Sequence, residues 1–454
     1  MTTDNASRRA FLGGAARLSL LGGAAPFALN LAAVGAASAQ SAADYKAMVC
    51  VFLFGGNDCA NTVIPYDPAA HATYRNARLP IARDRATLVP LAVEAGKPPL
   101  ALPPELASFA GHFNAGRAAV IANVGPLVEP VTRGQLAAGS AALPAKLFSH
   151  NDQQSTWQAN ATEGAQFGWG GRIGDVVASG NANQTFTCMS ISGNTVWLSG
   201  QASTQYQVSP AGAVAVEAIG RSTLFGSTRA PALLEQLIRQ ERLHLLERDY
   251  AALTRRSLGA RVQLNSALAS LAPIATPLPA ENGLAAQLRM VARTIAARGA
   301  LGVRRQVFFV SAGGFDNHAF LSTSHPPLLK MLADALDSFY ATTVELGVAA
   351  QVTTFTASDF GRALLSNGDG SDHGWGAHHL VIGDAVRGGR VYGSFPTVAV
   401  GSADDAGHGR LIPTTAVDQY AATLARWMGV SAGGLVDILP HLGRFPSGGM
   451  DFLA

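Results

Sequence analysis

The stretch Met48-Val-Cys-Val-Phe-Leu-Phe54, followed by Gly55-Gly-Asn-Asp58, decides the fold. An apolar run without polar alternation predicts a strand that is covered on both faces, as strands of parallel sheets are. The two glycines predict a sharp turn at the end of that strand. Asp58 would then present a carboxylate just past the strand, at the edge of the sheet.

Further apolar runs and amphipathic segments alternate along the chain. The predicted strands are Met48–Phe54, Ala118–Val124, Gln306–Ser311, Gln351–Thr356 and Leu380–Gly383. The predicted helical segments are Leu233–Leu271, Ala285–Ala297 and Leu328–Leu346. Alternating strands and helices predict an α/β fold, with a doubly wound, mostly parallel sheet and helices on both faces.

Length and composition indicate one large packed domain. The chain has 454 residues, of which 48% are hydrophobic and 14% are charged, so disorder driven by charge is excluded for most of it. We expect a single domain over 45–454, with an irregular or β-rich insertion or cap at about 195–228. Pro/Gly-rich stretches at 90–104, 272–283 and 364–376 are typical of surface connections or lids.

The N-terminus has the pattern of an export signal. Residues 1–39 combine Arg8-Arg9-Ala-Phe-Leu, a Gly/Ala-rich apolar stretch and the small residues Ala37-Ser-Ala39. This pattern predicts a cleaved twin-arginine signal, with the twin-arginine translocase as a partner and a periplasmic or secreted mature protein. An uncleaved anchor and a chance arginine pair are the alternatives. No later segment is apolar enough for an integral membrane span.

Charge and cysteine content exclude other classes. A net charge of +3, with no basic run outside the leader, gives no electrostatic basis for nucleic-acid binding. The chain has only three cysteines, Cys50, Cys59 and Cys188. A small and odd number of cysteines does not indicate a disulfide framework. One bridge with a leftover thiol remains open, and Cys50 is expected to be a buried thiol.

Acids and histidines follow several of the predicted strands. These segments are Gly55–Thr62, Gly313-Gly-Phe-Asp-Asn-His318, Ser358-Asp-Phe-Gly-Arg362 and Ser371-Asp-His-Gly374. Because the carboxyl ends of parallel strands share one edge, their side chains should converge there. Crowded carboxylates resist joint ionisation unless a cation compensates them, and mixed Asp/His donors suit Zn²⁺, Mn²⁺ or Fe better than Ca²⁺. The pattern predicts a site for one divalent cation or a pair.

Each candidate also has an ordinary structural role. Asp58 and Asp359 could cap helices or close turns, Asp316 and His318 could belong to a turn, and His373 could lie on a solvated loop tip. Arg362 is expected near the start of a helix after Asp359, where it could hold an anion. In the polar cluster Ser149–Trp157, Ser155 is a candidate nucleophile, with helix capping as the alternative.

Two familiar motifs are incomplete. Asp359-Phe-Gly361 spells the metal-binding triplet of kinases, but no catalytic or Gly-rich nucleotide loop accompanies it. The sequence contains no Gly-x-Ser-x-Gly elbow, so the interpretation as an α/β-hydrolase lacks a nucleophile.

Together, the leader and the four segments resemble the domain of unknown function 1501 family, which is similar to the alkaline phosphatase and sulfatase superfamily. This resemblance implies an alkaline phosphatase-like sheet with two metals (Zn²⁺, Mn²⁺ or Mg²⁺) at its carboxyl edge. Asp58 and Asp359 would serve one metal, and Asp316, His318 and His373 the other. The chain departs from the family pattern at Asn317, where Thr is usual, and at Asp359, where Glu is usual.

We therefore expect a metal-dependent hydrolase of phosphate or sulfate esters, acting on a small anionic ester or a glycan. Arg362 would hold a non-bridging oxygen of the ester. The alternative is a non-catalytic secreted protein that uses the same scaffold to bind a glycan or a protein partner.

Overall fold

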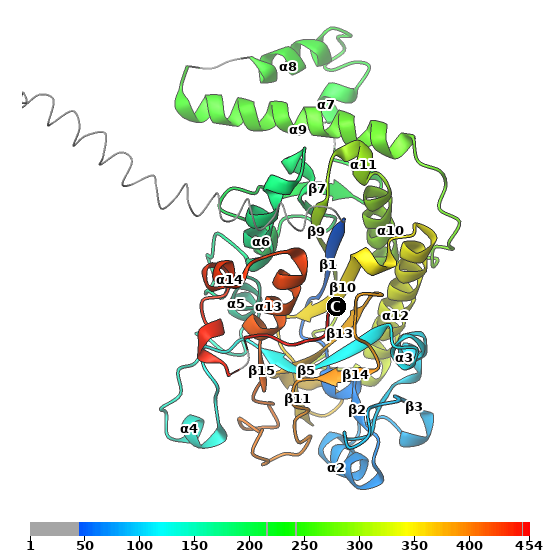
Figure 1. The fold of residues 1–454 in the computed structure, drawn as a ribbon, viewed down its shortest axis with the longest axis vertical. Coiled ribbons are helices and arrows are strands. Elements are labelled where there is room, and N and C mark those ends of the chain that lie inside the picture. The colour runs from blue at the N-terminus through cyan, green and yellow to red at the C-terminus, as the bar shows by residue number, and fades with distance from the viewer. Residues whose placement is uncertain (1–44, 215–216, 241–242, 447) are drawn as a thin grey trace, which may run out of the picture.

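A central mixed sheet organises the molecule (Figure 1). The computed structural model describes residues 45–214, 217–240, 243–446 and 448–454. Within these residues the main sheet has ten strands in the order β14-β5-β13-β10-β1-β9-β6-β7-β8, with β15 paired to β5. Their bounds are β1 Lys46–Leu53, β5 Ala118–Gly125, β6 Cys188–Ser190, β7 Tyr206–Ser209, β8 Gly212–Ala213, β9 Arg305–Ala312, β10 Val352–Ser358, β13 Ala377–Ile382, β14 Arg390–Tyr392 and β15 Thr415–Ala416.

Strand β1 explains why the sheet is covered on both faces. It pairs in parallel with β10 on one side and β9 on the other. Val49 and Val51 face one hydrophobic core, while Cys50 and Phe52 face the other, and all four are fully buried. Because successive side chains of a strand point to opposite faces, an unbroken apolar run supplies both cores at once.

Helices form a layer on each face, and Figure 1 shows α10 and α12 on one side of the sheet and α6 and α13 on the other. The helices are α2 Pro68–Arg78, α3 Ala107–Asn114, α4 Arg133–Ala137, α5 His150–Ala159, α6 Trp169–Val177, α7 Glu217–Gly220, α8 Ala230–Arg239, α9 Leu245–Ala269, α10 Gly283–Ala296, α11 Arg298–Leu301, α12 Leu321–Glu345, α13 Val417–Met428 and α14 Ala432–Ile438. This arrangement confirms the predicted α/β fold, with a mostly parallel sheet between two helical layers.

The predicted strands all occur, within a residue or two at most ends, and one of them runs against the others. β13, which contains the predicted run from Leu380, pairs antiparallel with both β10 and β5. The predicted helical segment Leu233–Leu271 is divided into α8 and α9. The segment 195–228 contains β7 and β8, which extend the edge of the central sheet beyond β6.

Two smaller sheets lie outside the main one. β11 (Arg362–Ser366) and β12 (Ser371–His373) form a hairpin, which accounts for much of the stretch predicted as a lid at 364–376. β2 (Ile64–Pro65), β4 (Leu100–Leu102) and β3 (Val89–Pro90) form the other.

The predicted leader, residues 1–39, lies outside the described residues. Within the described part of the chain, we find no helix with the length and apolar character needed to cross a membrane.

Asp418, in the first turn of α13, is a buried carboxyl group with little compensation. It is 1% exposed, and its Oδ1 accepts a hydrogen bond of 3.0 Å from the backbone N–H of His441. Burial raises the pKa of Asp418 to about 6, and its backbone N–H bonds only partly oppose this shift. The folded protein therefore holds this proton more tightly than the unfolded chain, and stability falls as the pH rises through about 4 to 6.

We predict that Asp418→Asn stabilises the protein at neutral pH and not in acid. At about 1.4 kcal/mol per pKa unit, the gain in the free energy of unfolding at pH near 7.5 is on the order of 1–3 kcal/mol. Urea unfolding at about pH 7.5 and pH 4 measures the difference. The exposed Asp437→Asn is the control, and an equal gain at both pH values would contradict the mechanism.

Candidate functional site

The carboxyl ends of β10, β1 and β9 meet at one edge of the sheet. Their parallel pairing brings the loops that begin at Phe54, Gly313 and Asp359 together. Gly55 allows this approach, because its φ is +114° and a Cβ there would lie 2.3 Å from the backbone nitrogen of Asp316. The predicted convergence of three acidic loops at this edge is present.

The β11–β12 hairpin adds a fourth segment to the same edge. Arg362 and His373 are directly opposed across it, and the N–H of Ser371 donates to the carbonyl of Asn317 at 3.1 Å. The expected helix after Asp359 is therefore wrong, since the chain enters a strand at Arg362. The bends at 367–370, where the N–H of Asn367 donates to the carbonyl of Gly370 at 3.2 Å, reverse the chain and form a hairpin in place of a helix.

Three histidines surround one oxygen of Asp316. Its Oδ1 lies 3.1 Å from His318 Nε2, 3.4 Å from His373 Nε2 and 3.5 Å from His150 Nε2. The two Nε2 atoms of His318 and His373 are 2.9 Å apart. The side chains are between 22% and 45% exposed, so the group is open to solvent. We call Asp316, His318, His373 and His150 the histidine centre.

The partners of the Nδ1 atoms fix the proton on each imidazole. His150 Nδ1 lies 2.7 Å from Asp359 Oδ2, His373 Nδ1 lies 2.7 Å from the carbonyl of Phe148, and His318 Nδ1 lies 3.3 Å from Asp372 Oδ1. These oxygens only accept, so each Nδ1 donates. With a proton on each Nδ1, the three Nε2 atoms are the ring nitrogens that face the Asp316 oxygen.

His150 was not among the predicted ligands. It begins α5, in the polar cluster that was noted for its hydroxyls, and its buried Nε2 has no hydrogen-bond partner within the described residues. The ring packs against His373 and Phe360, with centroids 4.4 Å and 4.8 Å away. A histidine inside a polar cluster was the only available signal, because its acidic partner lies 209 residues further on.

Asp359 orients His150 and does not join the histidine centre directly. Its Oδ2 accepts from His150 Nδ1 at 2.7 Å, from Gln154 Nε2 at 2.8 Å and from the backbone N–H of Gly55 at 3.2 Å. Such a carboxylate behind a histidine sets the tautomer and the direction of the ring. The predicted place of Asp359 at the edge is correct, and its observed contacts are those of a positioning group.

Burial and neighbouring charges shift the pKa values at the histidine centre in different directions. Partial burial raises the pKa of Asp316, but the hydrogen bond and charge of Arg362 outweigh it and hold that pKa below its usual range. The hydrogen bond to Asp359 raises the pKa of His150, whereas burial lowers the pKa of His373. The carboxylate of Asp316 is therefore ionised at neutral pH and attracts cations.

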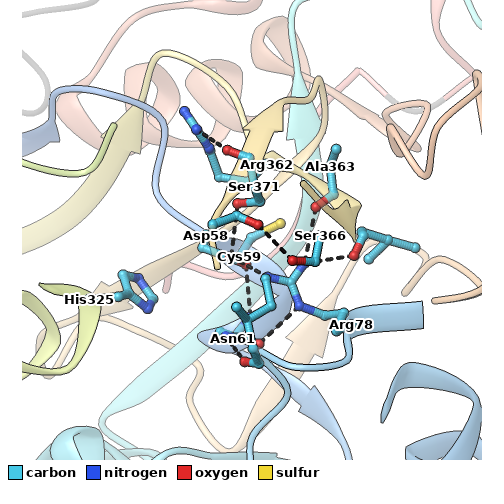
Figure 2. Close-up of polar contacts among 12 residues, drawn as sticks. Asp58, Cys59, Asn61, Arg78, His325, Arg362, Ala363, Ser366 and Ser371 are labelled. Carbon is cyan, nitrogen blue, oxygen red and sulfur yellow. Dashed lines mark hydrogen bonds and ion pairs between the residues drawn. The ribbon is translucent and has the colours of Figure 1, made fainter. Parts of the chain in front are cut away.

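Asp58 is paired with an arginine instead of facing the centre (Figure 2). Its Oδ2 forms a fully buried ion pair with Arg78 Nη2 and accepts from Ser371 Oγ at 3.3 Å, while its Oδ1 accepts from the N–H of Asn61 at 3.1 Å. This differs from the metal-ligand role predicted for Asp58. A guanidinium already neutralises the carboxylate, and Arg78 lies at the end of α2, where no motif pointed to it.

The two predicted catalytic residues, Ser155 and Arg362, also form hydrogen bonds within the protein. Ser155 Oγ donates to the carbonyl of Thr162 at 2.8 Å, which makes it neither a helix cap nor a free nucleophile. Arg362 is buried and donates to Asp316 Oδ1 at 2.6 Å, to the carbonyl of Gly55 at 3.2 Å and to the carbonyl of Ser371. It therefore holds the histidine centre together, and its fully buried guanidinium is not open to a substrate anion.

Other polar residues near the edge belong to the core. His378 and His379 are buried in β13, and burial lowers the pKa of each to about 3, so both are neutral. His325, seen in Figure 2, has its pKa lowered to about 4 by burial and lies 2.9 Å from Asn57 Oδ1. Cys50, Cys59 and Cys188 are buried free thiols.

The donors of the histidine centre fit a small divalent cation. The Oδ1 atom of Asp316 lies 3.1–3.5 Å from the three Nε2 atoms, and the Nε2 atoms of His318 and His373 are 2.9 Å apart. Donors bound tetrahedrally at about 2.0–2.1 Å would lie about 3.3 Å apart. The donor atoms of His150, Asp316 and His373 all lie within 4.8 Å of one another, and the buried Nε2 of His150 has no hydrogen-bond partner within the described residues. Imidazole donors favour Zn²⁺ over Mg²⁺ or Ca²⁺, so His150, Asp316 and His373, with His318 beside them, could hold a zinc ion.

The sheet and this edge cluster define an α/β protein with a histidine–carboxylate centre. The model of the family "Protein of unknown function (DUF1501)" matches residues 45–434, and the chain belongs to that family. A comparison with curated proteins finds no match.

Solved structures with a similar arrangement include sulfatases and a phosphatase. The PsFucS1 sulfatase from Pseudoalteromonas sp. is 9% identical with a TM-score of 0.38, over 91% of this chain and 72% of that one. Ps i-CgsB in complex with k-i-k-neocarrahexaose gives 10% and 0.36, over 87% and 76%. A mutant of the alkaline phosphatase PafA gives 12% and 0.28, over 70% and 64%. Likenesses this weak carry no argument about activity or substrate.

We predict that Ser155→Ala costs only stability. The change removes one hydrogen bond to Thr162, which is worth about 1 kcal/mol in the free energy of unfolding. Urea unfolding measures this loss. Any turnover found for the protein should remain within about twofold of wild type. A loss of turnover by several orders of magnitude, with stability preserved, would restore Ser155 as a nucleophile.

Proposed function

We propose that the protein is a metal-dependent hydrolase of phosphate or sulfate esters, with its cation at the histidine centre. The observation that carries this proposal is the convergence of three imidazole Nε2 atoms on the carboxylate of Asp316, at a solvent-open sheet edge. The motif resemblance to the phosphatase and sulfatase superfamily supports the choice of ester. A small anionic ester or a charged glycan is the proposed substrate class.

A bound divalent cation supplies Lewis-acid stabilisation of the negative charge that develops during ester hydrolysis. The residues of the chain provide a rigid frame. Arg362 holds the Asp316 carboxylate at 2.6 Å, and the Phe148 carbonyl holds the His373 ring. Phe360 packs against the rings of both His150 and His373 and limits their rotation. Such preorganisation lowers the reorganisation needed when charge develops.

Water is the proposed attacking group. Ser155 donates its hydroxyl to the Thr162 carbonyl, and Ser371 donates its hydroxyl to Asp58. A covalent route needs a free hydroxyl or thiol beside the reacting centre. In a direct displacement, the water oxygen bonds to phosphorus or sulfur, the bond to the alcohol oxygen breaks, and a proton from water passes to the leaving alcohol.

Export by the twin-arginine route to the periplasm or beyond is part of the proposal. It is supported by the Arg8-Arg9 motif and the small residues before Gln40. Changing Arg8-Arg9 to a pair of lysines should retain the protein in the cytoplasm, as measured by cell fractionation. Unchanged export would contradict this route.

We predict that His150→Ala and Asp316→Asn lose both zinc and hydrolysis. Removing one donor should lower zinc affinity by at least about tenfold. Metal analysis after dialysis and assays with aryl phosphate and aryl sulfate measure the two effects. His112→Ala is the matched control, because His112 pairs with Asp337 at 2.8 Å away from the centre. Zinc retained by the wild-type protein without hydrolysis would favour the binding-protein alternative, and a wild-type protein that retains no metal would contradict the proposed centre.

Asp359→Asn tests the positioning of His150. An amide could still accept from Gly55 and Gln154, but it no longer fixes the protonated Nδ1 of His150 through a charge. We expect zinc affinity to fall roughly 10–100-fold with little change in folding. Competition with a zinc-binding dye measures the affinity. Equal affinity in wild type and variant would contradict the role.

A further inference from the structure

The resemblance implies a second cation held by Asp58 and Asp359, and the structure does not fit it. Both oxygens of Asp58 are used, one by Asn61 and the other by Arg78 and Ser371. Asp359 directs its Oδ2 to three N–H donors and leaves a single buried oxygen, Oδ1, without a partner within the described residues. One free oxygen is too few to hold a divalent cation, which takes four or more donors.

Arg78 is held firmly in the place opposite Asp58 (Figure 2). Its Nη1 donates to the carbonyls of Ala363 and Leu364 at 3.1 Å and 3.3 Å, and its Nε donates to Asn61 Oδ1 at 3.1 Å. Both side chains of the ion pair are completely buried. A guanidinium does not lose its proton in proteins, so this charge is permanent.

Arg78 is connected to the histidine centre indirectly, through the β11–β12 hairpin. Ala363 and Leu364, whose carbonyls it binds, come directly after Arg362 in β11. Arg362 in turn holds Asp316, and Ser371 of the paired strand donates to Asp58. Arg78 and Asp58 therefore clamp both strands of the hairpin that carries His373.

We infer that the chain binds one divalent cation, at the histidine centre, and that the guanidinium of Arg78 takes the place of a second. This inference rests on the cation proposed above for the histidine centre. Arg78 is a positioning residue: it compensates Asp58 and fixes the hairpin. A second ion at Asp58 would have to displace a guanidinium that has three other acceptors around it.

Metal stoichiometry tests the first part. The metal-free full-length protein is titrated with Zn²⁺ by calorimetry, for wild type, Asp58→Asn and His150→Ala. We expect one equivalent for wild type and for Asp58→Asn, and at least tenfold weaker binding for His150→Ala. Two equivalents in wild type, one of them lost in Asp58→Asn, would overturn the inference.

A cycle of variants tests the clamp without any metal. In the presence of a chelator, Arg78→Met leaves a buried carboxylate uncompensated, whereas the double variant Asp58→Asn/Arg78→Met leaves no buried charge. We expect a clearly lower denaturation midpoint for the single variant than for the double variant. Equal midpoints would overturn the role of Arg78. If wild type binds no zinc but the cycle gives the expected result, the proposed function and the single bound cation are both contradicted, and the role of Arg78 as the internal cation opposite Asp58 remains.

Discussion

Negative charge at the end of a parallel sheet has to be compensated, and the rest of the site depends on how this is done. Asp58, Asp316 and Asp359 arrive at the same edge on neighbouring strands or loops. Each is compensated differently: Asp58 by the buried guanidinium of Arg78, Asp316 by Arg362, and Asp359 by N–H donors. Like charges this close would otherwise resist ionisation.

The three carboxylates differ in burial and therefore in role. Asp58 and Asp359 are fully buried and act within the protein, whereas Asp316 is 45% exposed and faces solvent. Only the exposed carboxylate is surrounded by three imidazole Nε2 atoms. The proposed chemistry therefore centres on Asp316, and the buried acids determine where its neighbours point.

Local sequence was sufficient for the strands and for the convergence of acidic loops. Apolar runs such as Met48–Phe54 mark buried strands, and parallel pairing brings the loops after these strands to one edge. The direction of β13 could not be predicted, because a short apolar run has the same composition in either orientation. The expected helix after Asp359 was wrong for a related reason: the hairpin that forms there depends on its docking to the loop around Asn317.

Pairings between distant residues account for what the sequence did not reveal. Arg78 and His150 lie in helices whose sequences give no sign of a special role. Folding brings Arg78 next to Asp58 and His150 next to Asp359. Asp316, His318 and His373 lie together, as both the convergence of strand ends and the family resemblance predicted, and their assignment to one metal came from the resemblance alone. The hydrogen bond from Ser155 to a backbone carbonyl could not be predicted either, because the residue type does not indicate which partner a side chain binds.

The β11–β12 hairpin has a mechanical consequence. Arg362 and His373 stand opposite each other in it, and one contacts Asp316 while the other completes the ring of imidazoles around that carboxylate. A displacement of the hairpin would remove both at once, so the centre cannot be dismantled one contact at a time. Opening and closing of this edge should therefore be cooperative, with a single assembled state and a single disassembled one.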